Sequence, residues 1–312
     1  MGKIAFVYPG QGAQKVGMGK DFYENSERSK EIFDLAASVL DFDIKQVCFE
    51  ENDLIDNTKY TQAALVTTCL AMTKEVLALG IKPDVTAGLS LGEYAAIATA
   101  GGMSDEEAIK TVRVRGILMD EAVPDGKGAM AAVLGMTGEA VYEVVKDLAD
   151  VSIANYNCPG QIVITGEKSA VENAGKVLSE NGAKRVIPLN VSGPFHSAFL
   201  KGAGETLGET LETVDWKELE IGYVTNVDAS LVTDIRQTKD LLMKQVSSSV
   251  LWEQSIRNMI EMGVDTFVEI GPGRTLAGFN KKIGKAIGKE LTTYTVGTME
   301  DIDKLVEALK GE

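Results

Sequence analysis

The segment Gly88-Leu89-Ser90-Leu91-Gly92 holds a serine between two glycines. It follows a short apolar run that begins at Val85, and it precedes a helical pattern that extends to about Ala100. A G-x-S-x-G motif between a strand and a helix is typical of a nucleophile elbow, a strained turn that exposes the serine hydroxyl. We therefore interpret Ser90 as a nucleophile rather than as part of an ordinary glycine–serine turn. The amide of Leu91, at the start of the helix, would then help to bind an oxyanion.

A serine nucleophile needs a base, and the chain contains a single histidine, His196. This histidine follows Gly193-Pro194-Phe195 and stands where we expect a helix to begin. A lone histidine is more often structural than catalytic, but no other imidazole is available to activate Ser90. We therefore predict that His196 is the base. No acid stands out as a third member of a triad, because the chain contains 46 aspartates and glutamates.

Two other stretches of the sequence can each be interpreted in two ways. Pro9-Gly10-Gln11-Gly12 follows the first predicted strand, at the sheet edge where α/β proteins bind ligands. Its backbone could supply a second oxyanion donor, or it could simply be a tight turn. Arg113 and Arg115 lie two apart on one predicted helix and so point in different directions. Either could be a buried clamp for a carboxylate, although an arginine in such a helix is more often a surface residue.

Strand-like runs alternate with helical patterns along the chain, which indicates an α/β fold with a parallel sheet. A glycine-rich break at residues 125–128 is followed by the order β-α-β-β-α-β, which is that of a ferredoxin-like unit. We therefore expect a small domain over residues 126–191, inserted into a large domain formed by residues 1–125 and 192–312. Expected strands cover residues 4–8, 85–89, 129–134, 151–156, 162–165, 185–191, 221–224, 266–270 and 294–296. Expected helices cover residues 26–40, 61–79, 92–100, 104–122, 138–148, 169–181, 196–214, 239–247 and 249–262.

Composition limits the possible partners and the cellular location. The formal charge is −15, so we expect no nonspecific binding to nucleic acid. No run of about 18 apolar residues exists, so we expect no membrane span. Cys48, Cys69 and Cys158 have neither metal nor redox spacing, and we read them as reduced thiols of a cytoplasmic protein.

Taken together, the motifs resemble those of malonyl-CoA:acyl carrier protein transacylases and of the acyltransferase domains of fatty-acid and polyketide synthases. The likeness runs over essentially the whole chain, and its motifs are ordered and well spaced. They are Tyr8-Pro9-Gly10-Gln11-Gly12, Gly88-Leu89-Ser90-Leu91-Gly92-Glu93, Arg115-Gly116-Ile117-Leu118-Met119, Ala154-Asn155-Tyr156-Asn157, Pro159-Gly160-Gln161, Pro194-Phe195-His196-Ser197, Asn226-Val227-Asp228-Ala229, Gln245 and Glu269-Ile270-Gly271-Pro272-Gly273. The resemblance implies a hydrolase-like large domain with a ferredoxin-like insert.

The resemblance also implies a reaction. A malonyl group would pass from malonyl-CoA to a serine and then to the phosphopantetheine thiol of an acyl carrier protein, supplying fatty-acid synthesis. Coenzyme A enters only as the thioester substrate, and we expect no metal and no other cofactor. We expect a cytoplasmic monomer. The resemblance implies that Ser90 is the acylated nucleophile, that His196 is the base and later the acid, and that the amides of Gln11 and Leu91 form the oxyanion hole. It implies that Arg115 binds the malonyl carboxylate and that the backbone carbonyl of Gln245 orients the histidine. Asn155 would lie near the substrate, and Phe195 would form a wall of the acyl pocket.

The carrier protein needs a local basic surface, because carrier proteins of this family are acidic and this chain is acidic overall. The densest basic stretch holds Lys281, Lys282, Lys285 and Lys289 on one presumed helix, and Lys184 with Arg185 is a second candidate. A solvated helix face is an equally good interpretation of the lysines.

Two positions depart from the family's pattern. Leu89 stands where a histidine is usual before the nucleophile, so a polar contact in the pocket would be lost. Ser249 stands where a proline commonly follows the Gln245 position, which puts the seating of that loop in question.

A serine-dependent thioesterase of the α/β hydrolase type is the alternative function, and a noncatalytic scaffold is a second alternative. The first would have no reason to hold an arginine for a carboxylate, and the second would not need the serine, the histidine and the arginine together.

Overall fold

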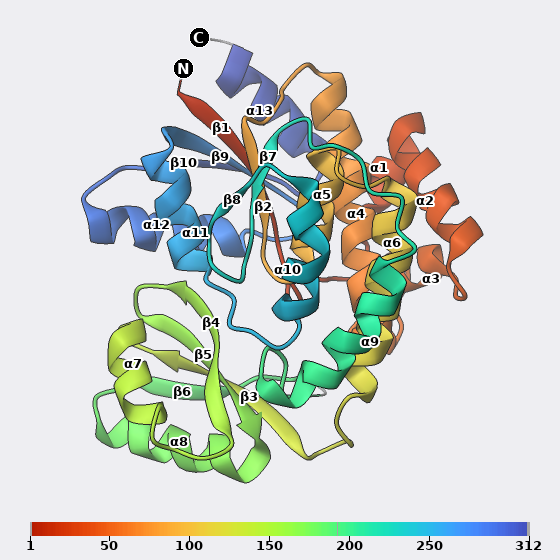
Figure 1. Cartoon of the computed structure of the whole chain (residues 1–312). Coiled ribbons are helices and arrows are strands. Elements are labelled where there is room, and N and C mark those ends of the chain that lie inside the picture. Colours follow the sequence, from red (N-terminus) through yellow and green to blue (C-terminus); the bar gives the residue numbers. More distant parts are fainter. Residues whose placement is uncertain (1, 192, 311–312) are drawn as a thin grey trace.

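The strands of the protein form two separate sheets in the computed structural model, which describes residues 2–191 and 193–310 (Figure 1). The larger sheet has the order β10-β9-β1-β2-β7-β8. Neighbouring strands in it are parallel, except that β8 runs antiparallel to β7. Its strands are β1 (Lys3–Tyr8), β2 (Val85–Gly88), β7 (Gly222–Val224), β8 (Leu231–Val232), β9 (Val264–Ile270) and β10 (Thr292–Val296).

The second sheet belongs to the small domain and is antiparallel throughout. Its order is β4-β5-β3-β6, which is the strand order of a ferredoxin-like unit. Its elements are β3 (Gly128–Leu134), α7 (Gly138–Val145), β4 (Val151–Cys158), β5 (Gln161–Glu167), α8 (Lys168–Glu180) and β6 (Arg185–Pro188). The predicted α/β fold with a parallel sheet and a ferredoxin-like part is confirmed.

The remaining helices surround the larger sheet. They are α1 (Lys20–Asn25), α2 (Glu27–Val39), α3 (Ile44–Phe49), α4 (Thr58–Ala78), α5 (Gly92–Thr99), α6 (Asp105–Glu121), α9 (Lys201–Leu211), α10 (Thr238–Gln245), α11 (Trp252–Glu261), α12 (Thr275–Ile287) and α13 (Met299–Lys310), with 3₁₀ turns at Ala198–Leu200 and Ile235–Gln237. None of the helices described is long and apolar enough to cross a bilayer.

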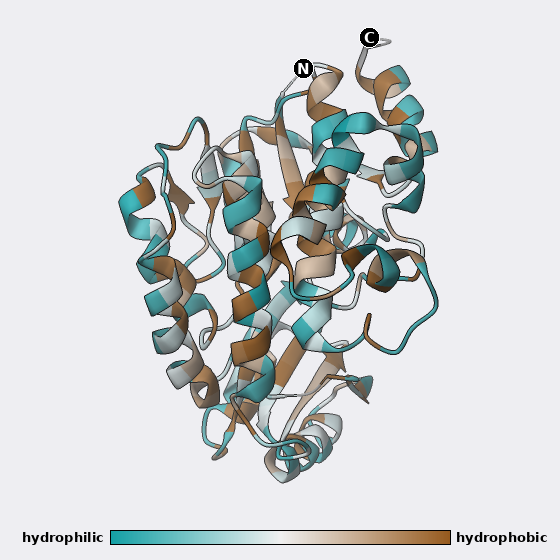
Figure 2. Cartoon of the chain, turned by 90° about the vertical axis from the view of Figure 1, so that its right-hand side faces the viewer, coloured by the Kyte–Doolittle hydropathy of each residue, from teal (hydrophilic) through white to brown (hydrophobic). Residues whose placement is uncertain are grey.

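Strand β1 shows why both faces of the larger sheet are covered. Its residues from Ala5 to Tyr8 are fully buried, as expected of a central parallel strand. Side chains alternate between the two faces of a strand. Phe6 and Tyr8 pack with α4 and α5, while Ala5 and Val7 pack with α11 and α12. Seen from the side, the outer helices carry both apolar and polar segments, as helices with one buried face do (Figure 2).

The small sheet uses its two faces differently. Ala131 and Val133 of β3 pack under α7 and α8 in a separate apolar cluster. Met130 and Val163, on the other face, pack with the core of the large domain. The small domain therefore covers the carboxyl edge of the large sheet and forms one wall of the space above it.

The segment from the last strand of the small domain to α9 differs from the sequence-based expectations in two details. His196 does not open a helix, because its φ is +57° and the helix α9 begins only at Lys201 after a 3₁₀ turn. The last strand of the small domain ends at Pro188 rather than at residue 191. Ser192, the expected first residue after the insert, lies outside the described residues, as do residues 1 and 311–312.

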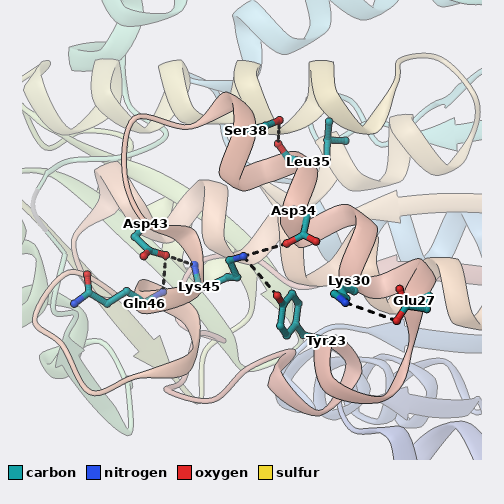
Figure 3. Close-up of polar contacts among 9 residues, drawn as sticks. All are labelled: Tyr23, Glu27, Lys30, Asp34, Leu35, Ser38, Asp43, Lys45 and Gln46. Carbon is teal, nitrogen blue, oxygen red and sulfur yellow. Dashed lines mark hydrogen bonds and ion pairs between the residues drawn. The ribbon is translucent and has the colours of Figure 1, made fainter.

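The short helix α3 was not predicted, and local capping explains its presence. The Asp43 side chain accepts hydrogen bonds from the amides of Lys45 and Gln46 and so caps the first turn. The Lys45 ammonium then reaches across to α2, where it pairs with Asp34 at 3.0 Å (Figure 3). A helix of six residues is too short for apolar periodicity to reveal.

Candidate active site

The nucleophile elbow is present at the junction of β2 and α5. Ser90 has a φ of +55°, a strained value for a residue other than glycine. The flanking glycines are required, because a Cβ on Gly88 would lie 1.9 Å from the carbonyl carbon of Gly92, and a Cβ on Gly92 would lie 2.5 Å from the Tyr8 oxygen. The backbone amide of Ser90 donates to Asn226 Oδ1 at 2.6 Å, which holds the turn in place.

His196 faces Ser90 across the end of the sheet. Its Nε2 lies 2.7 Å from Ser90 Oγ, and its Nδ1 lies 2.9 Å from the backbone oxygen of Gln245. A carbonyl can only accept, so Nδ1 carries the proton and Nε2 is left as the acceptor for the serine hydroxyl. Burial, with a smaller effect of the Arg115 charge, lowers the pKa of His196 to about 4. The imidazole is therefore neutral near pH 7, as a base must be before it takes a proton.

Arg115 enters the same cluster from α6. Its side chain is 1% exposed, and its Nη2 donates to Ser90 Oγ and to Gln245 Oε1, each at 3.0 Å. Its Nη1 donates to Gln62 Oε1. Arg115 forms no ion pair within residues 2–191 and 193–310, and its Nε has no hydrogen-bond partner there. A buried guanidinium without a counter-ion is costly and suits an anionic ligand.

The contacts of the two arginines of α6 show which of them is free of an ion pair in the described structure. Arg113 forms a two-point ion pair with Asp41, at 2.8 and 2.9 Å, and its guanidinium makes cation–π contacts with the rings of Phe42 and Tyr60. It also donates to the backbone oxygen of Lys59. Arg113 is thus already paired and lies away from Ser90.

A cleft of about 430 Å³ opens in front of the serine and the histidine. Both domains line it, and four further residues expected at the site lie on its wall: Gln11, Leu91, Asn155 and Phe195. The backbone amides of Gln11 and Leu91 donate to no acceptor within the described parts of the chain, although the Gln11 side chain bonds to Thr58 Oγ1. Two unpaired amides beside a nucleophile are what an oxyanion hole requires.

The two unusual positions have clear places in the structure. Leu89 lines the cleft and packs over Gly10, so the wall before the nucleophile is apolar. Ser249 Oγ donates to the Ile153 oxygen at 2.6 Å, and the next residue, Val250, makes backbone bonds to both Ala154 and Tyr156. The segment after Gln245 is therefore fastened to β4 without a proline.

One lysine of α12, Lys282, contacts a residue that lines this cleft. Lys281, Lys282 and Lys285 are exposed, and Lys282 Nζ donates to Gln161 Oε1 at 3.1 Å. Gln161 itself lines the cleft. A larger hollow of about 1000 Å³ lies beside α8 on the small domain, but it contains neither Ser90 nor His196.

Sequence reasoning assigned no role to three residues that complete the cluster: Gln62, Glu93 and Asn226. Asn226 Nδ2 donates to the Gly88 oxygen at 2.7 Å, and Glu93 Oε2 accepts from Gln245 Nε2 at 2.6 Å. Glu93 and Asn226 belong to motifs that carried the family resemblance, so a signal for them existed. Gln62 lies inside the buried helix α4, where nothing in the sequence separates it from its neighbours.

Comparisons with known proteins agree with this geometry. Residues 5–309 match the acyl transferase domain family. A curated relative, the malonyl CoA-acyl carrier protein transacylase of Bacillus subtilis (strain 168), is 45% identical over 317 aligned residues, covering 100% of this chain and 99% of the relative. The crystal structure of malonyl CoA-acyl carrier protein transacylase from Clostridium perfringens Atcc 13124 superposes with a TM-score of 0.94 at 41% identity, covering 99% of this chain and 98% of that one.

A second similar structure includes a partner. The holo complex PlMCAT:AntF, a type II PKS acyl-carrier protein with its malonyl-transacylase, gives a TM-score of 0.93 at 35% identity and covers 99% of this chain and all of that one. The chain therefore belongs to the acyl transferase domain family. Within it, the chain groups with the malonyl CoA-acyl carrier protein transacylases over its full length.

Proposed function

We infer that this chain transfers the malonyl group of malonyl-CoA to the phosphopantetheine thiol of an acyl carrier protein, and so supplies fatty-acid synthesis. The activity is that of an acyl-carrier-protein S-malonyltransferase. The strongest support for this assignment is the arrangement of side chains around Ser90. Ser90 Oγ lies 2.7 Å from His196 Nε2 and 3.0 Å from a nitrogen of Arg115, a buried cation without an ion pair in the described structure.

The reaction proceeds in two half-reactions through Ser90. Its Oγ attacks the thioester carbon of malonyl-CoA while His196 Nε2 takes the hydroxyl proton. The tetrahedral intermediate collapses, the carbon–sulfur bond breaks, and the departing coenzyme A thiolate receives the proton from the imidazolium. The thiol of the carrier protein then attacks the malonyl ester, with His196 first accepting the thiol proton and finally returning it to Ser90.

The charges that develop in this sequence have partners in the cleft. The negative oxygen of each tetrahedral intermediate is bound by the amides of Gln11 and Leu91, which have no other acceptor in the described structure. The positive imidazolium is stabilised at Nδ1 by the Gln245 carbonyl. Arg115 binds the carboxylate of the malonyl group, because a guanidinium matches a carboxylate with two parallel hydrogen bonds.

The acyl group is enclosed by apolar side chains. Phe195 is 5% exposed and lines the cleft directly beside His196, so its ring limits the space at the α-carbon of the acyl group. Asn155 also lines the cleft, and in this proposal it lies near the substrate.

The carrier protein docks at the rim of the cleft beside α12. Lys281, Lys282 and Lys285 are exposed on this helix, and the contact of Lys282 with Gln161, which lines the cleft, supports docking beside the entrance. A structure similar to this chain holds a carrier protein in complex with a transacylase, which supports a direct partner of this kind. Local charge of this sort steers an acidic partner even where the net charge of the enzyme is unfavourable.

We also propose the domain limits 1–125 and 192–312 for the large domain and 126–191 for the small one. The separate antiparallel sheet supports this division. The protein works as a cytoplasmic monomer in this proposal. The location is supported by the three cysteines, each of which is unpaired and buried.

Intact mass spectrometry tests the proposed function. Mixing the protein with malonyl-CoA should add one malonyl group, and adding holo carrier protein should remove it and add it to the carrier. A thioesterase would instead release malonate to water faster than to the carrier. Rapid hydrolysis without carrier malonylation would therefore overturn the proposal.

A further inference from the structure

Glu93 is a buried carboxylate that holds the reactive groups without touching them. It lies in the first turn of α5, three residues after Ser90, and its side chain is fully buried. Its Oε2 accepts two hydrogen bonds, from Gln245 Nε2 at 2.6 Å and from the backbone amide of Asn226 at 3.1 Å. Both donors belong to residues that bind the catalytic pair directly.

The first branch of this network leads to the base. The Gln245 side chain donates to Glu93 and to the Ser90 carbonyl, and its Oε1 accepts from Arg115. These bonds fix the orientation of the amide, because its nitrogen donates to the Glu93 carboxyl and its oxygen accepts from the Arg115 guanidinium. The backbone carbonyl of the same residue holds Nδ1 of His196 at 2.9 Å.

The second branch leads to the nucleophile. The Asn226 side chain binds both ends of the elbow, accepting from the Ser90 amide at 2.6 Å and donating to the Gly88 carbonyl at 2.7 Å. Ser90 occupies a strained backbone conformation, and such a conformation persists only where the surroundings enforce it. Glu93 holds the backbone from which this asparagine extends.

We propose that Glu93 is a positioning residue: by accepting from Gln245 and Asn226 at a single oxygen, it fixes His196 and Ser90 relative to each other. It orients the base as a triad acid would, but indirectly. Gln245 connects the carboxyl group to His196, and Asn226 connects it to Ser90. This inference rests on the proposed roles of Ser90 and His196.

The second side-chain oxygen of Glu93, Oε1, makes it possible to test the effect of the hydrogen bonds apart from the effect of the negative charge. Oε1 is buried without a hydrogen-bond partner in the described residues, and burial raises the pKa of Glu93 to about 7. Nearby charged or titratable groups are Arg115 on α6, Tyr94 on α5 and Tyr223 on β7. A proton on Oε1 leaves Oε2 able to accept both bonds, so Glu93→Gln is a close copy of the protonated residue.

Three substitutions at this position and one control make the test. Glu93→Gln retains an acceptor oxygen at full reach and removes the charge. Glu93→Asp retains the charge but is one methylene shorter, so it cannot reach both donors. Glu93→Met removes the acceptor and fills most of the volume. The control is Thr86→Val, which removes a buried hydrogen bond to the same helix at Ala96 without altering the network.

The measurement is the rate at which malonyl-CoA acylates Ser90, by quenched-flow intact mass, together with the melting temperature of each variant. Misplacement by about 1 Å costs roughly 10²-fold in rate, so Glu93→Met should acylate about 100-fold more slowly. Glu93→Gln should lose no more than about tenfold, because hydrogen bonds to a neutral acceptor are roughly half as strong as those to a charged one. Glu93→Asp should be slower than Glu93→Gln, and Thr86→Val should acylate at the rate of the unaltered protein.

Each contrary outcome overturns the proposal in a distinct way. Full-rate acylation of Glu93→Met would show that the network does not position the pair. Glu93→Asp acylating faster than Glu93→Gln would show that charge, not reach, matters, and this order can be measured even where Glu93→Met does not fold. A loss in Thr86→Val as large as that in Glu93→Met would show a general effect of stability. Ser90→Ala, measured alongside, separates these results from a failure of the proposed function, because an adduct in that variant would refute the nucleophile itself.

Discussion

Replacing Arg115 by alanine should change the choice of acyl donor rather than simply slow the enzyme. Acetyl and malonyl thioesters differ by one carboxylate, and Ser90, which lines the cleft, is contacted from behind by the buried guanidinium of Arg115, which has no ion pair in the described structure. Removing one partner of a buried hydrogen-bonded charge pair costs about 2–5 kcal/mol. At about 1.4 kcal/mol per factor of ten, kcat/KM for malonyl-CoA should fall by roughly 30-fold to several thousand-fold.

The structure adds a second effect that must be separated from the first. Arg115 also donates to Ser90 Oγ and Gln245 Oε1, so its loss leaves those two oxygens without that donor. This part of the damage applies to every donor alike. Acetyl-CoA has no carboxylate to lose, so its turnover should fall only by this shared part, and the ratio of malonyl to acetyl kcat/KM isolates the carboxylate contact. Arg115→Lys should recover only part of that ratio, because an ammonium cannot form the two parallel bonds.

The assay is steady-state transfer to holo carrier protein with each donor in turn, before and after substitution. Arg113→Ala serves as the matched control, because Arg113 is on the same helix but is paired with Asp41. It should leave the donor ratio unchanged. A fall by the same factor for malonyl-CoA and acetyl-CoA in Arg115→Ala would refute the reasoning, since Arg115 would then be holding the site together and not recognising a carboxylate.

Further outcomes are expected for the catalytic pair, the pH profile, the acyl pocket and the docking lysines. Ser90→Ala should form no malonyl adduct by intact mass yet keep its melting temperature, whereas His196→Ala should slow transfer by roughly 10²–10⁴-fold, the usual effect of losing a general base. Because a base works only when unprotonated and the pKa of His196 is about 4, kcat/KM of the Glu93→Gln variant, which has no titratable side chain at that position, should stay level from pH 7 to about pH 5 and fall as the pH drops through 4; a fall near pH 6.5 in that variant would contradict this. Phe195→Ser should weaken a preference for malonyl-CoA over methylmalonyl-CoA that is itself worth only about 1–3 kcal/mol, and equal kinetics with both donors in the unaltered protein would remove this role. Reversing the charges of Lys281 and Lys282 should raise KM for the carrier protein and leave malonyl-CoA kinetics alone, and an unchanged carrier KM would direct attention to another basic surface.

The nucleophile and its elbow could be predicted from the sequence because their signal is local. A strand, two glycines around a serine and a helix lie within sixteen residues, and the structure shows the strained φ of Ser90 that this spacing requires. The helix that carries Arg115 was equally predictable. Ser104 accepts from the amide of Glu107, as the capping pattern in the sequence indicated.

The choice between Arg113 and Arg115 could not be made from residue patterns alone, because it depends on other helices. Arg113 is neutralised by Asp41, which is distant in sequence, and its ring partners are Phe42, next to Asp41, and Tyr60 on α4. The position of His196 was misjudged for a related reason. Its φ of +57° reflects the need to meet both Ser90 and Gln245, and this tertiary requirement overrides a helical pattern downstream.

The lack of a triad acid follows from the substrate that the site must bind. His196 needs an acceptor at Nδ1, and either a carboxylate or a carbonyl would serve. A carboxylate at that point would lie in the same cluster as Arg115, whose Nη2 already contacts the Gln245 side chain at 3.0 Å. It would pair with the guanidinium and compete with the malonyl carboxylate. The neutral carbonyl of Gln245 orients the imidazole without adding a charge, and the side chain of the same residue stands between Arg115 and the carboxylate of Glu93. One residue thus aligns the base and keeps the cation available for the substrate.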